Sequence, residues 1–345
     1  HPAAGLFLEM GLGKTVITLT AINELMYDRF EVSKVLVIAP LRVAQDTWSR
    51  ESAKWDHLKH LKIAKILGTA EERIAALWED DVDIYVINRE NVVWLVDILE
   101  ENRIRWPFDM VIVDELSSFK SNQAKRFKAL RKMRPMIDRI VGLTGTPAAN
   151  SLEDLWAEMY LLDLGQRLGK TLGGFRARYL IPDKSNGYVV YSYLPKEGAE
   201  AEVYDKISDI CMSIKKEDVL SLPGQIYSDI VVRPPDALLK KYKKFERDKV
   251  LESLDAEGDI VAGSAAALTN KLLQFANGAI YDEDRQVHEL HDLKLEALEE
   301  LVEQAGGDPV LILYTYQHDE ARIAARIPCR KLDTAQDIRD WNAGK

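Results

Sequence analysis

The stretch GLFLEMGLGKT, residues 5–15, decides the fold of this chain. It runs from a short apolar strand through a glycine loop into a predicted helix over residues 14–25. The spacing suits a phosphate-binding loop, because glycines let backbone N–H groups point inward and Lys14 supplies a positive charge for the outer phosphates. The Thr15 hydroxyl can reach a Mg²⁺ ion, and the helix N-terminus adds partial positive charge at the same place.

The match to the strict pattern G-x-x-x-x-G-K-T is incomplete, because Leu8 stands in place of the first glycine. A plain turn between a strand and a helix, without a ligand, is therefore the alternative. The helical spacing of apolar residues after the loop favours the phosphate site. The residues expected to hold the nucleotide are Met10, Gly11, Leu12, Gly13, Lys14 and Thr15.

The composition is that of a globular, acidic protein. The chain has 345 residues, 47% of them hydrophobic, and a formal charge of −10. No apolar run reaches the roughly 18 residues of a membrane span, and no basic-then-apolar leader is visible, so neither membrane insertion nor secretion is indicated. The two distant cysteines, Cys211 and Cys329, fit a reducing cytosol, so we expect a location in the cytoplasm, or in the nucleoid or viral-host cytosol. Proteins that coat nucleic acid are usually basic, so any contact with DNA should be a local, salt-sensitive basic groove.

Up to about residue 165, apolar runs alternate with helical stretches, which is typical of a parallel sheet covered on both faces. Besides the first strand, we expect strands at residues 34–40, 83–88, 110–115 and 139–147. Ligands of such sheets collect at the carboxyl ends of the strands, where the polar residues of each segment lie. Residues 1–165 are thus predicted to form an α/β domain that binds nucleotide.

The pattern changes after residue 165. Glycine-rich turns, tyrosines and short strands such as 187–193 indicate an insertion and connector over residues 166–235. Helical stretches follow, and then a helix near 294–304 and a strand at 310–314 repeat the α/β pattern. Residues 236–345 are therefore predicted to begin a second α/β domain.

Two acidic residues end the strand at 110–115. Phosphoryl transfer needs a carboxylate to hold the metal ion and a second group to orient water. Asp114 can anchor Mg²⁺ and Glu115 can orient or deprotonate the attacking water, so with Lys14 they are the expected catalytic residues. The alternative is an acidic pair that only opens the next helix. The polar turn at residues 144–147 favours the catalytic interpretation of this pair. The phosphate loop, the acidic strand end and this turn each follow an apolar strand and are expected at one edge of the sheet.

With these motifs the chain resembles the Swi/Snf-like family of helicase superfamily two, the double-stranded DNA translocase ATPases. The first four similar segments are residues 9–15, 39–48, 114–117 and 143–150. Residues 218–223, 272–278 and 294–316 resemble the family's connector and second lobe. The resemblance implies a RecA-like P-loop NTPase lobe, a connector or insertion and a partial second RecA-like lobe, with ATP and Mg²⁺ as cofactors and duplex DNA as partner.

Several positions depart from the family pattern. Ser117 replaces a histidine, Ala148 replaces a glutamine, and Met212-Ser213 stand where the family has an arginine pair. The first two family side chains couple nucleotide state to DNA contact, so we expect a re-tuned coupling. The family's adenine-reading segment would precede His1, and its last arginine motifs would follow Lys345. We therefore expect a fragment that lacks the remainder of the second lobe. Without arginines that contribute about 10³ to 10⁵ in rate, this chain alone should hydrolyse ATP weakly or not at all.

A basic run follows the acidic motif. Between residues 120 and 139 the only acid is Asp138, and a solvated helix face is the alternative to a DNA contact there. The resemblance to the family implies further DNA contacts, by residues at or just after the ends of the strands at 34–40 and 139–147. Contacts to the DNA backbone carry no sequence information, so we expect sequence-independent binding. The expected DNA contacts are Arg42, Gln45, Lys120, Gly145 and Thr146.

These observations predict an ATP-dependent DNA translocase or helicase-like motor that couples hydrolysis to movement on, or remodelling of, duplex DNA. A nucleotide-responsive DNA-binding or partner-docking module without turnover is the alternative. A P-loop kinase or metabolic NTPase is a third possibility, against which the Thr-Gly-Thr-Pro strand end at residues 144–147 argues.

Overall fold

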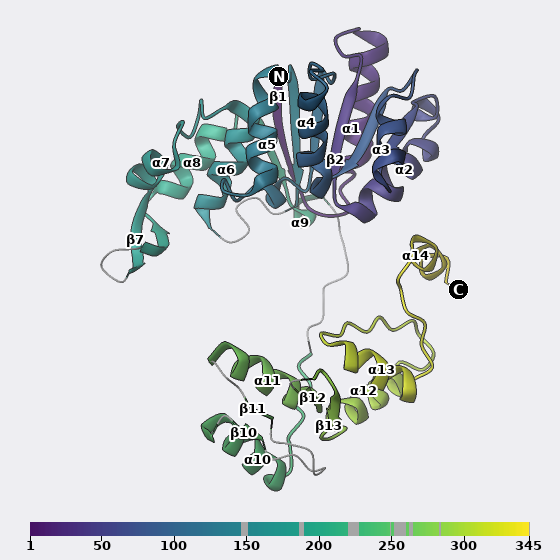
Figure 1. Cartoon of the computed structure of the whole chain (residues 1–345), viewed down its shortest axis with the longest axis vertical. Coiled ribbons are helices and arrows are strands. Elements are labelled where there is room, and N and C mark those ends of the chain that lie inside the picture. The colour runs from purple at the N-terminus through teal and green to yellow at the C-terminus, as the bar shows by residue number, and fades with distance from the viewer. Residues whose placement is uncertain are drawn as a thin grey trace. The chain divides into compact units, whose positions relative to one another are not determined.

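The computed structural model of the chain divides into two compact units, His1–Pro223 and Gly224–Lys345 (Figure 1). It describes residues 1–145, 151–185, 190–219, 228–248, 250–251, 260–261, 265–282 and 284–344. The insertion predicted over residues 166–235 is thus divided between the two units. Each unit has apolar clusters of its own.

The first unit is built on a seven-stranded sheet with the order β3-β4-β2-β5-β6-β1-β9. Every ladder in it is parallel, so the α/β parallel sheet expected from the alternating pattern is confirmed. Its strands are β1 (Ala3–Leu8), β2 (Val35–Ala39), β3 (Ile63–Ile66), β4 (Ile84–Asn88), β5 (Met110–Asp114), β6 (Arg139–Thr144) and β9 (Cys211–Ile214).

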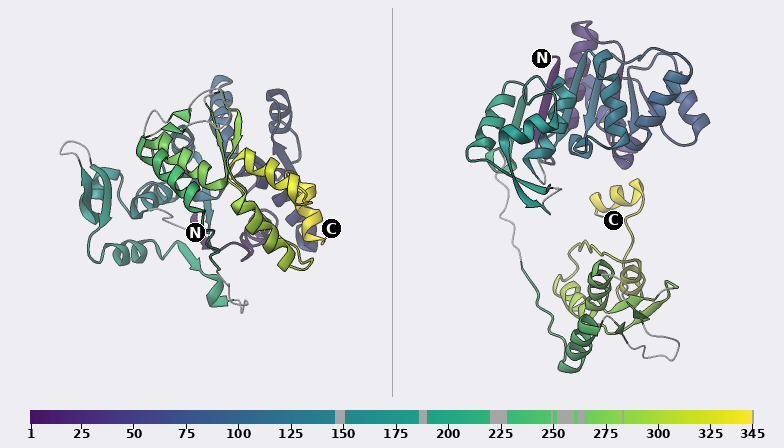
Figure 2. Two further views of the ribbon diagram at one scale, coloured as in Figure 1. Left: turned by 90° about the horizontal axis from the view of Figure 1, so that it is seen from below. Right: turned by 60° about the vertical axis from the view of Figure 1, so that its left-hand side comes forward.

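Helices cover both faces of this sheet (Figures 1 and 2). Successive residues of a strand point to opposite faces, and in β2 Leu36 and Ile38 enter one core while Val35 and Val37 enter the other. The first core contains side chains of α3 to α6, and the second contains those of α1 and α2. The helices are α1 (Lys14–Asn23), α2 (Trp48–Lys54), α3 (Ala70–Leu77), α4 (Val92–Glu101), α5 (Lys125–Met133) and α6 (Leu152–Asp163).

A small subdomain extends the first unit beyond α6. It consists of α7 (Leu172–Tyr179), an antiparallel hairpin of β7 (Leu180–Ser185) and β8 (Val190–Pro195), and α8 (Ala199–Ile207). The hairpin projects away from the sheet in Figure 1. The chain then returns through β9 to pair with β1, and the short helix α9 (Lys216–Val219) follows.

The second unit is mainly helical within its described residues. Small apolar clusters hold it together, one around Phe245, Phe275 and Ile280 and another around Leu295 and Ile323. Its helices are α10 (Asp236–Asp248), α11 (Ala265–Asn277), α12 (Leu293–Gln304), α13 (Gln317–Arg326) and α14 (Ala335–Asn342). Two short antiparallel pairs accompany them, β10 (Val250–Leu251) with β11 (Ile260–Val261) and β12 (Ala279–Tyr281) with β13 (Val287–Glu289).

The prediction of a strand at residues 310–314 is wrong. This segment has no strand assignment, and the side chains of Leu311 and Leu313 are 56% and 87% exposed. An apolar run becomes a strand only when another segment supplies the ladder hydrogen bonds, and no described segment pairs with it. The apolar composition alone therefore does not make this segment a paired strand.

No helix within the described ranges combines the length and the apolar character that crossing a membrane requires.

Candidate active site

The loop between β1 and α1 has the backbone that the glycines predict. Gly11 and Gly13 adopt φ angles of 87° and 78°, which L side chains rarely adopt. Gly13 caps the N-terminus of α1, and as a glycine it contributes no side-chain hydrogen bond to that helix end. The first N–H groups of α1 therefore suit an anionic ligand, because a helix N-terminus carries partial positive charge.

Lys14 is held over this loop by the strand that precedes it. Its Nζ donates to the carbonyl oxygens of Leu8, at 2.6 Å, and Glu9, at 3.3 Å. Leu8 replaces a glycine of the strict motif, but it takes part here through its backbone, so the replacement leaves this interaction possible. Thr15 follows Lys14 in the first turn of α1 and is partly exposed.

Asp114 ends β5 and accepts a hydrogen bond from the indole Nε1 of Trp48, at 3.0 Å. Trp48 is fully buried in α2. Burial raises the pKa of Asp114 and the negative charge of Glu115 adds to the effect, whereas the Trp48 hydrogen bond and the positive charge of Lys14 lower it. Lys14 and Asp114 thus act on each other electrostatically, although they are far apart in the sequence.

Glu115 adopts a left-handed backbone conformation, with φ 62° and ψ 62°, at the start of the 3₁₀ turn Leu116–Phe119. Such a conformation is uncommon for a residue with a side chain and is found disproportionately at functional sites. The Ser117 hydroxyl donates to Glu115 Oε1 at 2.9 Å. The serine that departs from the expected histidine therefore orients the carboxylate expected to act on water.

Gly145 lies beside the phosphate loop because β6, which it follows, is the neighbour of β1 in the sheet. A Cβ atom added to Gly145 would lie 3.7 Å from the carbonyl oxygen of Leu8 and 3.8 Å from the nitrogen of Met10. The third predicted motif thus adjoins the first. Thr146 and Ala148 lie outside the described residues.

Residues 3–278 match the family model of the SNF2-related domain. The chain belongs to the SNF2-related family. A phage protein named "Putative protein p41", from Acyrthosiphon pisum secondary endosymbiont phage 1, is 39% identical over 344 residues, which cover 97% of this chain and 74% of that protein. The CHD3-type chromatin-remodeling factor CHR7 of Arabidopsis thaliana is 31% identical over 165 residues, which cover 45% of this chain and 13% of that protein.

The SNF2-related fold is also seen in a solved structure. The SWI2/SNF2 ATPase core of Sulfolobus solfataricus, in complex with dsDNA, matches with a TM-score of 0.50 and 21% identity. The match covers 88% of this chain and 60% of that chain. It supports an α/β fold with a RecA-like lobe. The SNF2-related chain is therefore homologous to DNA-remodelling motors, while it spans only part of the remodellers that it matches.

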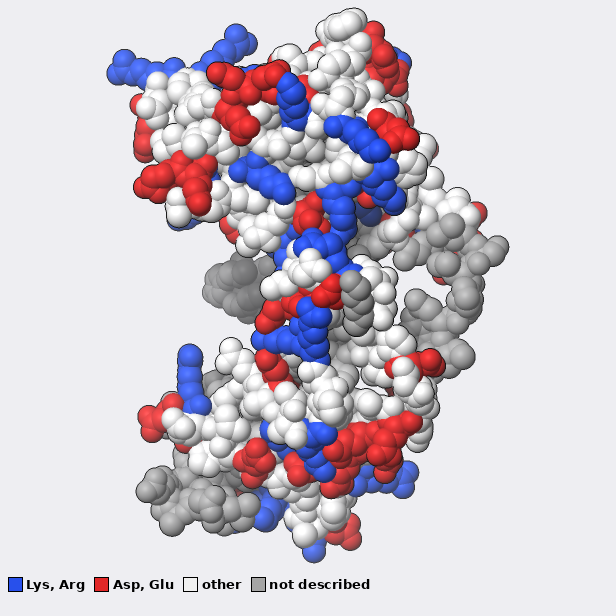
Figure 3. Space-filling view, turned by 90° about the vertical axis from the view of Figure 1, so that its right-hand side faces the viewer, with Lys and Arg blue, Asp and Glu red and all other residues white. Residues whose placement is uncertain are grey.

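The residues expected to contact DNA have different surroundings. Arg42 is exposed just before the π-helical turn Val43–Thr47, and Gln45 is exposed on that turn, where its carbonyl oxygen accepts a hydrogen bond from Lys65. Lys120 forms an ion pair with Asp154, at 3.3 Å. On the face drawn in Figure 3, Lys and Arg side chains interleave with Asp and Glu, so positive charge is local.

One arginine of the predicted basic run stabilises the fold and does not face solvent. Arg134 is buried and donates to the carbonyl oxygens of Ile137, Leu161 and Leu162. Two of these carbonyls belong to the last turn of α6, whose oxygens have no partner inside the helix. A solvated or DNA-facing position for Arg134 is therefore excluded, because its guanidinium caps α6.

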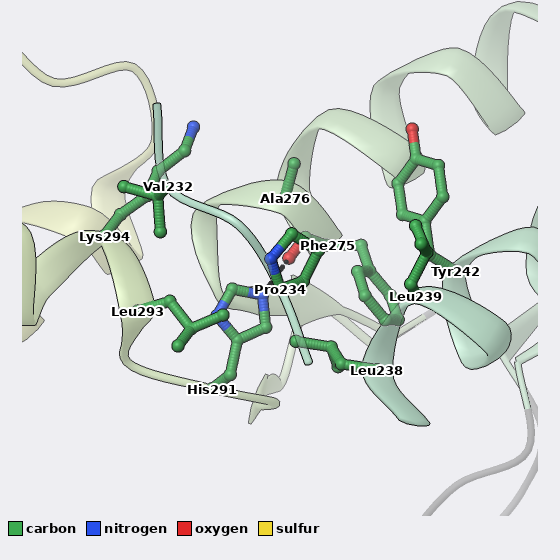
Figure 4. Close-up of a pocket in the computed structure, with 10 residues that line it drawn as sticks. All are labelled: Val232, Pro234, Leu238, Leu239, Tyr242, Phe275, Ala276, His291, Leu293 and Lys294. Atoms are coloured by element: carbon green, nitrogen blue, oxygen red, sulfur yellow. Dashed lines mark hydrogen bonds between the residues drawn. The ribbon is translucent and has the colours of Figure 1, made fainter. Parts of the chain in front are cut away.

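A hollow lies within the second unit (Figure 4). It has a volume of about 270 Å³, and its walls are mainly apolar side chains of α10, α11 and the chain before them. His291 lines it and is held to the carbonyl oxygen of Phe275 at 2.9 Å. Burial lowers the pKa of His291, with the nearby positive charge of Arg322 adding to the effect.

Sequence reasoning misses two residues that the structure places around the acidic motif. Trp48 stands out in the sequence only as part of a similar segment, which does not predict its hydrogen bond to Asp114. The signal available is that a buried indole N–H usually finds an acceptor. Glu158 carries no signal of this kind, because its position in a helix with many apolar residues belongs to no motif.

Proposed function

We propose that this SNF2-related chain binds MgATP at the loop between β1 and α1 and couples ATP hydrolysis to movement on, or remodelling of, duplex DNA. The observation that carries the proposal is the convergence of three motifs on one sheet edge. Lys14 lies over the end of β1, Gly145 lies beside it after β6, and Asp114 and Glu115 end β5. Sheet order puts these three strands side by side.

The residues at this edge of the sheet have different roles in phosphoryl transfer. The loop from Met10 to Thr15 surrounds the phosphates with N–H groups and the Lys14 ammonium. Thr15 and Asp114 are the residues that would hold Mg²⁺, and the ion would supply positive charge to the transferring phosphate. Trp48 and Lys14 both favour the ionised form of Asp114 that a metal ion requires. Glu115, held by Ser117, orients the attacking water.

Duplex DNA is the proposed track. The support is homology to remodelling motors and the likeness to the Sulfolobus ATPase core, which is itself in complex with dsDNA. Arg42 and Gln45 are exposed just beyond the carboxyl end of β2, on the same sheet edge as the nucleotide residues. Contacts by such side chains and by backbone groups near Gly145 would go to the DNA backbone, so binding should not depend on sequence.

Equilibrium binding of a non-hydrolysable ATP analogue with Mg²⁺ tests the nucleotide site. We expect Lys14→Ala to weaken binding by at least about tenfold, because a charge-assisted contact to phosphate contributes about 1.5–3 kcal/mol. Lys128→Ala is the matched control, since Lys128 is an exposed lysine on α5. Unchanged affinity in Lys14→Ala, with normal folding by circular dichroism, would refute the nucleotide site.

The competing function, a nucleotide-responsive module without turnover, makes a different prediction. It expects nucleotide and duplex DNA to bind but no phosphate release under any condition. Glu115→Gln would then leave both affinities unchanged and would have no activity to abolish. Release of phosphate that requires Glu115 excludes this module.

A further inference from the structure

A fully buried carboxyl group lies in the middle of α6. Glu158 is 0% exposed, and neither of its carboxylate oxygens has a hydrogen-bond partner among the residues that the structure describes. An ionised carboxylate without a partner is strongly disfavoured inside a protein, so such a group takes up a proton instead. Its place in the apolar face of α6 is therefore compatible with an uncharged acid and not with a free carboxylate.

Four titratable groups from three elements surround Glu158 electrostatically. They are Asp154, one turn earlier on α6, Lys120 and Glu115 on either side of the Leu116–Phe119 turn, and Tyr204 on α8. Burial, with the negative charges of Asp154 and Glu115, raises the pKa of Glu158 to about 8, although Lys120 opposes the shift. The effect of Glu115 connects this buried acid to the acidic motif.

Lys120, the lysine among these four groups, already forms an ion pair. Lys120 pairs with Asp154 at 3.3 Å, and the two side chains are 36% and 20% exposed. An ionised Glu158 would compete with Asp154 for Lys120, because both carboxylates lie on α6 one turn apart. It would also bring another negative charge close to Glu115, whose carboxylate is held by Ser117.

We propose that Glu158 is a positioning residue of the active site, which acts as an uncharged acid that leaves Lys120 on Asp154 and keeps further negative charge away from Glu115. This inference rests on the proposed function, in which Glu115 orients the attacking water. Loss of the proton from Glu158 draws Lys120 away from Asp154 and repels the Glu115 carboxylate. Hydrolysis therefore slows as Glu158 ionises, while nucleotide binding at the β1–α1 loop changes little.

Glu158→Gln tests the role, because glutamine keeps the shape of the protonated acid and cannot ionise. The rate of ATP hydrolysis with duplex DNA is measured for the wild-type protein and the variant from about pH 6 to about pH 9.5. We expect equal rates at neutral pH, a fall of at least about threefold in the wild type on the alkaline side, and a flat alkaline side in the variant. Glu153→Gln is the control, since Glu153 lies on the same helix but pairs with Arg176 at 2.7 Å, and it should keep the alkaline fall.

Two results would overturn the inference. One is an alkaline fall that persists in Glu158→Gln, and the other is a variant about tenfold slower than the wild type at neutral pH, which would mean that an ionised carboxylate is needed. If the glutamine variant does not fold, Glu158→Met replaces it, because methionine is also uncharged and of similar length.

Infrared difference spectroscopy gives a readout that does not depend on turnover. The spectrum of wild type minus Glu158→Gln at neutral pH should contain the C=O stretch of a protonated carboxyl group, and the band should disappear at alkaline pH. Absence of the band with normal hydrolysis overturns this inference and leaves the proposed function intact. Hydrolysis in the wild type that is unchanged in Glu115→Gln refutes the proposed function and the positioning role together, whatever the infrared band shows.

Discussion

Replacing Trp48 with phenylalanine removes one hydrogen bond from Asp114 and keeps an aromatic ring in the core. The indole Nε1 lies 3.0 Å from Asp114 Oδ2, and this hydrogen bond lowers the pKa of a carboxyl group that burial raises. Its loss raises the pKa of Asp114 further. Protons then compete with Mg²⁺ for Asp114 at a higher pH in Trp48→Phe than in the wild type.

The size of the effect follows from the type of hydrogen bond. A hydrogen bond to a charged group contributes about 1.5–3 kcal/mol, which is about 10- to 150-fold in an equilibrium constant. We expect the affinity for Mg²⁺ with an ATP analogue to fall by about tenfold or more at the acid end of a pH series. The two proteins should converge at the alkaline end, where Asp114 is ionised in both.

Titration calorimetry over that pH series measures the effect directly. Trp106→Phe is the matched control, because Trp106 is also buried but its indole Nε1 has no hydrogen-bond partner among the described residues. Both variants lose similar volume, so only the pH dependence separates them. The reasoning is refuted if Trp48→Phe and Trp106→Phe show the same pH dependence of affinity as the wild type.

Three further substitutions test one contact of the site and two contacts of the fold that carries it. Ser117→Ala frees the Glu115 carboxylate and should lower the rate of hydrolysis by about tenfold at unchanged nucleotide affinity, since about 1.4 kcal/mol of orientation is lost; an equal rate would contradict the role of Ser117. Gly5→Ala places a Cβ 2.7 Å from the Cys211 Sγ and should lower the free energy of unfolding in urea by about 1–3 kcal/mol, with partial rescue by Cys211→Ala as the check. Arg134→Met leaves the carbonyl oxygens at the end of α6 without their donor and should cost about 3 kcal/mol of unfolding free energy, whereas a loss below about 0.5 kcal/mol would contradict the capping role.

The interior of the sheet could be predicted because its strands are continuous apolar runs. Strand β2 is buried at every position, which is typical of a parallel strand covered on both faces. The two edge strands were missed for the opposite reason. Strand β3 exposes Lys65 and strand β9 exposes Met212, and each has only one neighbour in the sheet. A short run with polar or exposed positions does not stand out from a loop in the sequence.

Site residues could be predicted only where they form a short motif of residues close together in the sequence. The glycine loop and the Asp114-Glu115 pair are such motifs, and the structure brings them to one edge. The hydrogen bond from Trp48 depends on how α2 lies beside the end of β5. The burial of Glu158 depends on how α6 packs against β1, β6 and the Leu116–Phe119 turn. Both arrangements are set by contacts between segments that are far apart in the sequence. The strand predicted at 310–314 failed for a related reason, since pairing depends on a partner that the local sequence does not specify.

Phosphate release by this SNF2-related protein, with and without duplex DNA, tests the central claim most directly. The account predicts that duplex DNA of any sequence raises the rate of ATP hydrolysis in the wild type, and that Glu115→Gln abolishes hydrolysis while nucleotide still binds. A rate that is the same with and without DNA, or that is unchanged in Glu115→Gln, would contradict it.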